Sequence, residues 1–222
     1  NWSFVDGPVA AQLMVDQQDD RHAWIVNAPD GQYHIRATAS DGLLQGEFTA
    51  TLLVSDAVSV AIAINAGGAA MTASDGTHFE ADQYFTSGST TSSASGVAAI
   101  YATPDDALYQ IYRQGYGSWG YDIPIENGKY IVILHFAETY SPASVEGGRV
   151  ADIQLQDQPV LTKFSAYSLV GQRAASSFAF NTSVTNGNLK IRASRNGSTG
   201  ERARIDAIEV LRLDGIFSDG FE

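Results

Sequence analysis

Tyrosines at strand ends and in glycine-flanked loops are the residues of this chain best suited to ligand chemistry. Tyr140 ends a predicted strand over 130–140, just before the break at Pro142, and Tyr116 lies between two glycines. Glycine neighbours leave a side chain room and expose backbone amides. A sugar offers flat C–H faces, which aromatic rings cover, and hydroxyls, which carboxylates or amides bind. The two tyrosines therefore indicate sugar binding on loops at the end of a β structure.

Sequence motifs for catalysis are missing. The histidines do not form an HExxH pair, and the chain has neither a GxSxG nucleophile elbow nor a phosphate-binding glycine loop. A glycosidase needs two carboxylates about 5 to 10 Å apart across the bond that it cleaves. The carboxylates available are Glu138, Asp152, Glu201 and Asp206. Their spacing does not show that any two face each other, so we predict no enzymatic activity and interpret His135, between apolar neighbours, as a structural histidine.

Cofactor binding has little support in the sequence. The chain has no Cys, which excludes disulfides, thiol catalysis and zinc–thiolate sites. Aspartates that offer oxygen ligands to calcium are Asp75, Asp82, Asp105 and Asp106, without the spacing of an EF-hand. We predict no cofactor, with a structural Ca²⁺ as the alternative that the sequence leaves open.

The charge balance restricts the partners. A formal net charge of −12 and a pI of about 4.6 repel nucleic acid, anionic membranes and acidic polysaccharides. No apolar run reaches the roughly 18 residues of a membrane span. We expect a neutral carbohydrate as partner, and neither nucleic acid nor membrane, unless a local basic patch overrides the mean field. The first residue is Asn1 rather than Met, so we also expect contacts with other domains of a longer secreted protein.

Residues 1–57 have the pattern of β-strands. The chain is rich in Gly and only 17% charged, which is typical of a turn-rich β protein. Apolar residues alternate over 33–39 and 48–54, and turn signals occur at 29–31 and 40–42. The segment resembles the last strands of an Ig-like or PKD-like repeat. Because a whole sandwich of that kind takes about 100 residues, we predict a partial one.

A second β pattern covers residues 58–213. Asn127-Gly128 and Asn186-Gly187 predict two hairpins with tight turns. The small polar residues 86–95 predict a surface loop, and the alternating Trp119, Tyr121 and Ile123 predict core. We find no helical period in any window of about ten residues. Residues 214–222 form an acidic tail.

Seven segments of this second region occur in a characteristic order. They are Ile64-Asn65-Ala66-Gly67-Gly68, Asp75-Gly76-Thr77-His78-Phe79-Glu80-Ala81-Asp82, Leu108-Tyr109-Gln110, Gly120-Tyr121-Asp122-Ile123-Pro124-Ile125, Leu134-His135-Phe136-Ala137-Glu138-Thr139-Tyr140, Gly147-Gly148-Arg149-Val150-Ala151-Asp152 and Ile205-Asp206-Ala207-Ile208-Glu209-Val210. From Ile62 to Leu213 the chain thereby resembles the malectin-like carbohydrate-binding domain, carbohydrate-binding module family 57. The resemblance implies an antiparallel β-sandwich of jelly-roll type over 58–213.

The resemblance also implies site residues. Tyr140 takes the place of a tyrosine that contacts glucose, and Ser141 stands where the family has a second aromatic residue. Glu201 takes the place of a site aspartate, where a carboxylate accepts hydrogen bonds from two vicinal hydroxyls. Gln114 stands where the family has a tyrosine, and Tyr116 is the ring that we expect to replace it. The alternatives are that Tyr140 caps the core and that Glu201 is a solvated neighbour of arginines.

Two more tyrosines complete the predicted set of ligand-binding residues. Tyr112 opens a predicted loop over 112–118. The family has an aromatic residue near Ser95, where this chain has none, and Tyr84, Phe85 or Tyr101 are the candidates to replace it.

We therefore predict a non-catalytic carbohydrate-binding module that recognises neutral oligo- or polysaccharides with glucose-type units. It would belong to a larger secreted, bacterial, glycan-active or adhesive protein. The alternative is a protein-interaction or spacer module that has lost the sugar site, which the missing aromatics at Gln114, Ser141 and 86–95 favour. A small glycan-active enzyme is the third hypothesis.

Overall fold

The computed structural model describes residues 2–7, 12–15, 23–26, 31–40, 45–54, 58–94, 96–97, 99–196 and 200–213. The chain forms two compact units, residues 1–58 and 59–222. Ser95, the predicted tail 214–222 and most of the predicted turns at 29–31 and 40–42 lie outside the described residues.

The first unit consists of antiparallel strands. β1 (Trp2–Asp6), β4 (Gly31–Ser40) and β5 (Gln45–Val54) form one sheet in the order β1-β4-β5. β2 (Gln12–Val15) pairs with β3 (Ala23–Val26). The ring of Tyr33 is buried 6.0 Å from that of Phe4. The strands agree with the alternating pattern, and the Ig- or PKD-like relationship stays a prediction.

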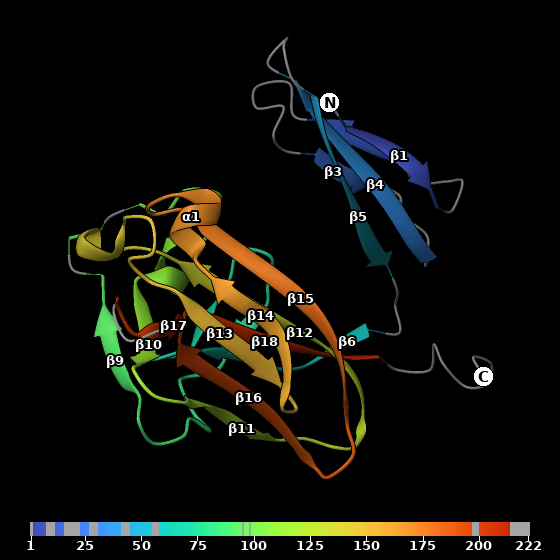
Figure 1. The fold of residues 1–222 in the computed structure, drawn as a ribbon. Helices are drawn as coiled ribbons and strands as arrows, with labels where there is room; N and C mark the ends of the chain where they lie inside the picture. The colour runs from blue at the N-terminus through green and yellow to red at the C-terminus, as the bar shows by residue number, and fades with distance from the viewer. Residues whose placement is uncertain are drawn as a thin grey trace. The chain divides into compact units, whose positions relative to one another are not determined.

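The second unit is an antiparallel β-sandwich, as predicted (Figure 1). One four-stranded sheet has the order β15-β12-β18-β6, and the other has the order β11-β16-β13-β14. Two smaller sheets, β17-β10-β9 and β7-β8, complete it. The bounds are β6 Val58–Asn65, β7 Met71–Thr72, β8 His78–Phe79, β9 Thr90–Ser93, β10 Ile111–Gly115, β11 Trp119–Pro124, β12 Gly128–Ala137, β13 Ala151–Leu155, β14 Gln158–Phe164, β15 Ala175–Val184, β16 Asn188–Arg195, β17 Ala203–Ile205 and β18 Ala207–Leu213.

Period-two alternation builds the core between the two large sheets. On β12, every second residue from Tyr130 to Phe136 is buried, and these side chains face those of β11 and β16. Trp119, Tyr121 and Ile123 are fully buried, which confirms their prediction as core residues. Each large apolar side chain removed from water in this way contributes about 1.5 to 3 kcal/mol.

A second apolar cluster covers the outer face of the β12 sheet. It includes Phe79 and Tyr109, the last residue of the 3-10 helix η1 (Asp106–Tyr109). His135 lies beside it, with Nδ1 3.0 Å from the Tyr109 hydroxyl and Nε2 2.7 Å from Oε1 of Glu209. Burial, and then the charges of Asp206 and Glu209, raise the pKa of Tyr109 above its ordinary value. These contacts support the interpretation of His135 as structural.

The two predicted hairpins are wrong. β11 pairs with β16, whereas β12 pairs with β15 and β18, so both Asn-Gly segments connect one sheet to the other. The two connections are bonded together, since the Gly187 N–H donates to Oδ1 of Asn127 at 2.8 Å. An Asn-Gly pair favours a reversal of the chain direction, but it does not determine which strand the following strand pairs with. Ile123 on β11 and Tyr130 on β12 lie in different sheets, and both bury their side chains in the core that the two sheets share.

Two predicted loops contain strands. Thr90–Ser93 within the predicted loop 86–95 is β9, which pairs with β10. Residues 112–115 of the predicted loop 112–118 belong to β10 itself. Thr and Ser supply the backbone hydrogen bonds of an edge strand while their mostly exposed side chains mimic the composition of a loop. The described helices are short: α1 (Ala166–Val170), η1 and η2 (Ser141–Ala143).

Glycines allow two close backbone contacts in this unit. Gly67 has φ +82°, and a Cβ there would lie 2.8 Å from the backbone carbon of Tyr112. A Cβ on Gly120 would lie 1.9 Å from the carbonyl oxygen of Ile191 on the paired strand β16. Both positions therefore require glycine.

Candidate functional site

Tyr140 lies just beyond the end of β12 with its ring in solvent. The residue is 44% exposed, so it is not sealed in the core. Its N–H donates to Oε1 of Glu138 at 2.9 Å, and its carbonyl accepts from the Ala143 N–H at 3.0 Å in the 3-10 turn η2. Pro142 favours this turn, because its fixed φ suits the first helical positions. The backbone of Tyr140 is thus held on both sides while the ring stays accessible.

Glu201 lies on a second loop that packs against the first. Its N–H donates to the carbonyl of Gly148 at 2.8 Å, and its side chain is partly exposed. Gly148 is itself in contact with η2, since a Cβ on it would lie 2.4 Å from the carbonyl oxygen of Ala143. The loops of Tyr140 and Glu201 are therefore neighbours.

Arg149 links these loops from beneath. Its Nε donates to Oε2 of Glu138 at 2.6 Å, two residues before Tyr140. Its Nη1 donates to the carbonyl of Arg202, next to Glu201, and lies 3.3 Å from Oε1 of Gln114 on β10. Arg149 is 7% exposed and Glu138 1% exposed. A buried ion pair thus holds three chain segments together below the predicted sugar-contact residues.

A second buried ion pair lies beside the first. Arg204 bonds both carboxylate oxygens of Asp206 and donates to the Thr139 hydroxyl at 2.6 Å. Its guanidinium carbon lies 3.5 Å from the centre of the Tyr112 ring. Burial raises the pKa of Asp206 to about 6, although Arg204 and the Ala137 N–H lower it. This layer fixes the backbone immediately before Tyr140.

The predicted ligand-binding residues fall into two groups by exposure. Tyr140, Tyr116 and Tyr84 are 44%, 50% and 42% exposed. Tyr112 and Gln114 are 4% and 6% exposed, and the Gln114 amide joins Arg149 to the Ser92 hydroxyl. Direct sugar contact by Gln114 or Tyr112 stays a prediction, and their contacts in this structure support the loops from below.

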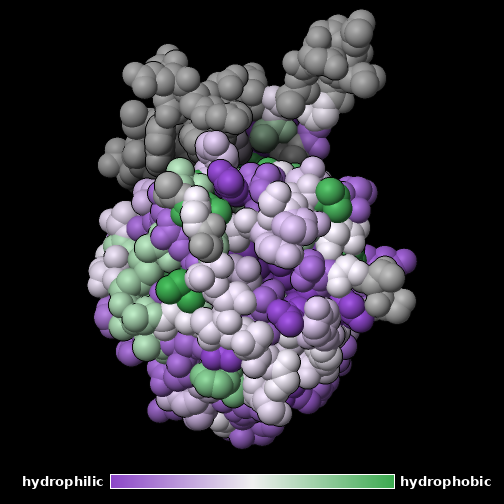
Figure 2. All heavy atoms as spheres, turned by 90° about the vertical axis from the view of Figure 1, so that its left-hand side faces the viewer, coloured by the Kyte–Doolittle hydropathy of each residue, from purple (hydrophilic) through white to green (hydrophobic). Residues whose placement is uncertain are grey.

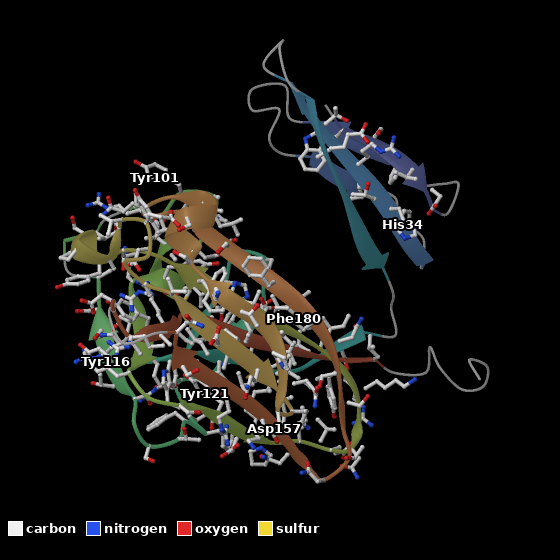
Figure 3. All side chains as sticks on the ribbon, in the orientation of Figure 1. His34, Tyr101, Tyr116, Tyr121, Asp157 and Phe180 are labelled. Atoms are coloured by element: carbon white, nitrogen blue, oxygen red, sulfur yellow. The ribbon has the colours of Figure 1, made fainter. Side chains whose placement is uncertain are left out.

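Tyr84 and Tyr116 have their own surroundings. Tyr84 has φ +61°, and its carbonyl accepts from the Asp122 N–H at 2.9 Å, along the edge of β11. The Tyr116 ring faces two guanidinium groups, those of Arg195 and Arg202. Figure 3 shows Tyr116 on the side of the domain where β9 and β10 lie. The contact with Arg202 therefore connects Tyr116 to the loop of Glu201, and the contacts described for Tyr84 involve β11 instead.

The surface at this side is polar and shallow. Figure 2 faces it and shows hydrophilic residues in the middle, with strongly hydrophobic residues scattered singly. A small cavity lined by Phe136, Glu138, Arg149 and Arg204 has a volume of about 20 Å³, which is room for a water and not for a sugar ring. This cavity is therefore not the place where a sugar ring could bind.

The aspartates considered for calcium serve the fold. Asp82 pairs with Arg113 and accepts from the Tyr121 hydroxyl at 2.9 Å, and Asp105 accepts from the N–H and hydroxyl of Ser74. Within the described ranges, no three His, Cys, Asp or Glu side chains are grouped to hold a metal ion. Nor do we find, in that part of the chain, a helix with the length and apolarity that a bilayer crossing requires.

The residues that connect the loops of the site were not predicted from the sequence. Arg149 appeared only as part of the Gly147-Gly148-Arg149 segment, without a role. Its partners Glu138 and Arg202 lie 11 and 53 positions away. The only feature of the sequence that pointed to Arg149 was the pair of glycines before it, and such a pair does not indicate what the arginine contacts.

Comparisons with known proteins agree with this fold. The family model described as the Malectin domain matches residues 60–208. Malectin of Mus musculus is 31% identical over 146 residues, covering 64% of this chain and 50% of that protein. Malectin-B of Xenopus laevis is 30% identical over 142 residues, covering 63% and 51%. The chain spans about half the length of the curated relatives that it matches.

Solved structures show the same fold at low identity. The ANXUR2 extracellular domain of Arabidopsis thaliana superposes with a TM-score of 0.63 at 15% identity, covering 72% of this chain and 50% of that one. The Bacteroides uniformis β-glucuronidase superposes with a TM-score of 0.57 at 14% identity, covering 86% and 24%. At these identities the likeness concerns the fold alone.

Proposed function

Because the chain belongs to the malectin-domain family, we propose that residues 58–213 form a non-catalytic carbohydrate-binding module. The observation that carries this proposal is the set of Arg149 contacts, which brings the loop of Tyr140 and the loop of Glu201 together. An exposed ring on a fixed backbone, with a carboxylate on the neighbouring loop, supplies the two kinds of contact that a pyranose offers.

The chemistry follows from the two side chains. The Tyr140 ring stacks on the C–H face of a glucose-type unit, and Glu201 accepts hydrogen bonds from two neighbouring hydroxyls of that unit. Ser141 adds no second ring, so the contact area is small. The affinity then lies at a Kd of about 10 μM to 1 mM.

Support for a non-catalytic role comes from the carboxylates. Glu138 and Asp206, the buried carboxylates nearest the site, are bonded to Arg149 and Arg204. A glycosidase would need one as acid and another as base or nucleophile, about 5 to 10 Å apart. Because both carboxylates are ion-paired with arginines, we infer that Glu138 and Asp206 position the loops rather than take part in catalysis.

The setting of the module is part of the proposal. An additional unit of strands precedes it, as in a secreted multidomain protein that acts on or adheres to glycans, whose other domains are its partners. The matched curated relatives come from mouse, Xenopus, human and zebrafish, which gives no support to a bacterial origin.

A protein-interaction module is the second candidate function. Gln114 is buried where the family has a tyrosine, and Ser141 replaces a second aromatic, so the sugar surface is reduced. A chain that binds no glycan and retains its fold would favour this candidate.

A glycan array with the whole chain, followed by calorimetry on the strongest glycan, tests the proposal. Tyr140→Ala abolishes saturable binding, whereas the matched variant Tyr140→Phe keeps the ring and retains most of it. Glu201→Gln weakens binding about tenfold by removing a charged acceptor. Binding that survives Tyr140→Ala, with the fold intact by circular dichroism, would contradict the assignment.

A further inference from the structure

Two arginines at the edge of the proposed site lack an acidic partner. Arg195 ends β16 and Arg202 precedes β17, and both are partly exposed. Among the described residues, no carboxylate oxygen lies within 4.0 Å of either guanidinium. Five other arginines in the described part of this unit are paired with acids, and the exposed Arg173 is not: the pairs are Arg113 with Asp82, Arg149 with Glu138, Arg192 with Asp122, Arg204 with Asp206 and Arg212 with Glu126. In a chain with 25 acidic and 13 basic residues, two neighbouring unpaired cations form a local basic patch.

Tyr116 holds the two guanidinium groups together. The guanidinium carbons of Arg202 and Arg195 lie 4.5 and 5.0 Å from the centre of its ring, within the range of a cation–π contact. Nη1 of Arg195 also donates to the carbonyl of Gly200 at 3.2 Å, and the carbonyl of Arg202 accepts from Arg149. Since each guanidinium carbon lies within 5.0 Å of the same ring centre, the two cations are no more than about 10 Å apart, and an anion that contacts both offsets their mutual repulsion.

We propose that Arg195 and Arg202 bind the carboxylate of a uronic acid unit, next to the hexose held by Tyr140 and Glu201. This rests on the proposed function, since it assigns a neighbouring subsite to the same glycan. A guanidinium presents a planar fork that matches a carboxylate in two parallel hydrogen bonds. Glu201 is bonded through its N–H to Gly148 and offers its own carboxylate to hydroxyls, so it suits the uncharged unit.

With this subsite the expected ligand is an acidic glycan, whereas the net charge of the chain alone favours a neutral one. A charge of −12 argues for a neutral glycan, but charges more than about 8 Å away are largely screened at physiological salt. The carboxylate of a bound sugar is governed by the two arginines nearest to it. Tyr116 then serves to position the arginines rather than to stack on sugar.

The test compares matched glycans on the full chain. An array carries uronic acid–containing oligosaccharides beside the same chains with each carboxyl reduced to hydroxymethyl, and beside neutral glucans and sulfated glucans. Calorimetry on the strongest pair follows for the unmodified chain, Arg202→Gln, Arg195→Gln and Lys190→Gln. Lys190 lies at the other end of β16, paired with Asp157, which Figure 3 shows well apart from Tyr116, so its variant removes the same charge away from the site.

We expect the unmodified chain to bind the uronate glycan about tenfold more tightly than its reduced form, and less tightly as salt rises. Arg202→Gln and Arg195→Gln abolish this preference but change binding of the reduced glycan less than twofold, and Lys190→Gln preserves the preference. Equal affinity for the uronate glycan and its reduced form overturns the subsite and leaves the proposed function standing. Tighter binding of sulfated glucans overturns the carboxylate assignment. Silence on every glycan overturns the proposed function itself, and the subsite with it.

Discussion

Replacing Arg149 by Met isolates the buried ion pair on which the site depends. Methionine keeps an unbranched apolar stem in place of the arginine stem but removes the guanidinium. The Glu138 carboxylate, 1% exposed, then retains its bond from the Tyr140 N–H and loses the one ion pair that it makes with an arginine among the described residues. An uncompensated buried carboxylate destabilises a protein by about 3 to 5 kcal/mol.

The retained N–H bond puts the expected loss near the lower end, at about 3 kcal/mol. For a unit of this size each kcal/mol lowers Tm by about 2 to 4 °C, so we expect a decrease of roughly 6 to 12 °C. Adding Glu138→Gln to Arg149→Met removes the unpaired charge and restores at least half of the loss. Sugar binding weakens in Arg149→Met as well, because the loops of Tyr140 and Glu201 lose their common contact.

Urea unfolding of the two single variants and the double variant measures the coupling directly. Lys190→Met is the matched control, since its pair with Asp157 is exposed and contributes about 0 to 1 kcal/mol. A loss below about 1 kcal/mol in Arg149→Met, or strict additivity in the double variant, would show that the ion pair does not hold the loops.

Three further outcomes follow from the fold. Gly120→Ala prevents folding or costs several kcal/mol, because its Cβ would lie 1.9 Å from the Ile191 carbonyl oxygen; an unchanged unfolding midpoint contradicts that close contact. Leu134→Ala costs about 2 to 5 kcal/mol by opening a cavity in the fully buried core, and a loss below about 1 kcal/mol in urea would contradict the packing. Burial raises the pKa of Asp206 from 3.8 to about 6, so the folded state binds the carboxyl proton more tightly than the unfolded chain does. The stability that this proton contributes is therefore complete below pH 3.8 and is lost as the pH rises through about 6. Carbon-13 NMR of the Asp206 carboxyl checks this, and a midpoint below 3.8 would refute it.

Much of the fold was predictable from local pattern. Alternation identified strands such as those over 33–39 and 48–54 and the core residues Trp119, Tyr121 and Ile123, because a strand exposes successive side chains to opposite faces. It missed β9 and most of β10, which fall in predicted loops. Strand pairing was not predictable, as the two wrong hairpins show. The Asn127-Gly128 signal describes a turn, whereas the partner of β12 depends on which surfaces the whole chain buries.

The site was predictable to a lesser degree. The sequence identified Tyr140 as a ring at the end of a strand, and the structure places it in solvent beside the loop of Glu201. For Gln114 the sugar contact stays a prediction, and the bonds of its buried amide to Arg149 and Ser92 were not predictable from the sequence, because they join residues distant along the chain.

The sequence by itself determined an all-β chain, an apolar core and an acidic mean charge, because these depend on residue type and on spacing within one strand. Tertiary structure alone decided which arginines are neutralised and which are not. Arg149 and Arg204 meet carboxylates in the interior, whereas Arg195 and Arg202 meet the ring of Tyr116. The reason is that Coulomb and cation–π interactions act over a few ångströms, and the path of the folded chain sets those distances.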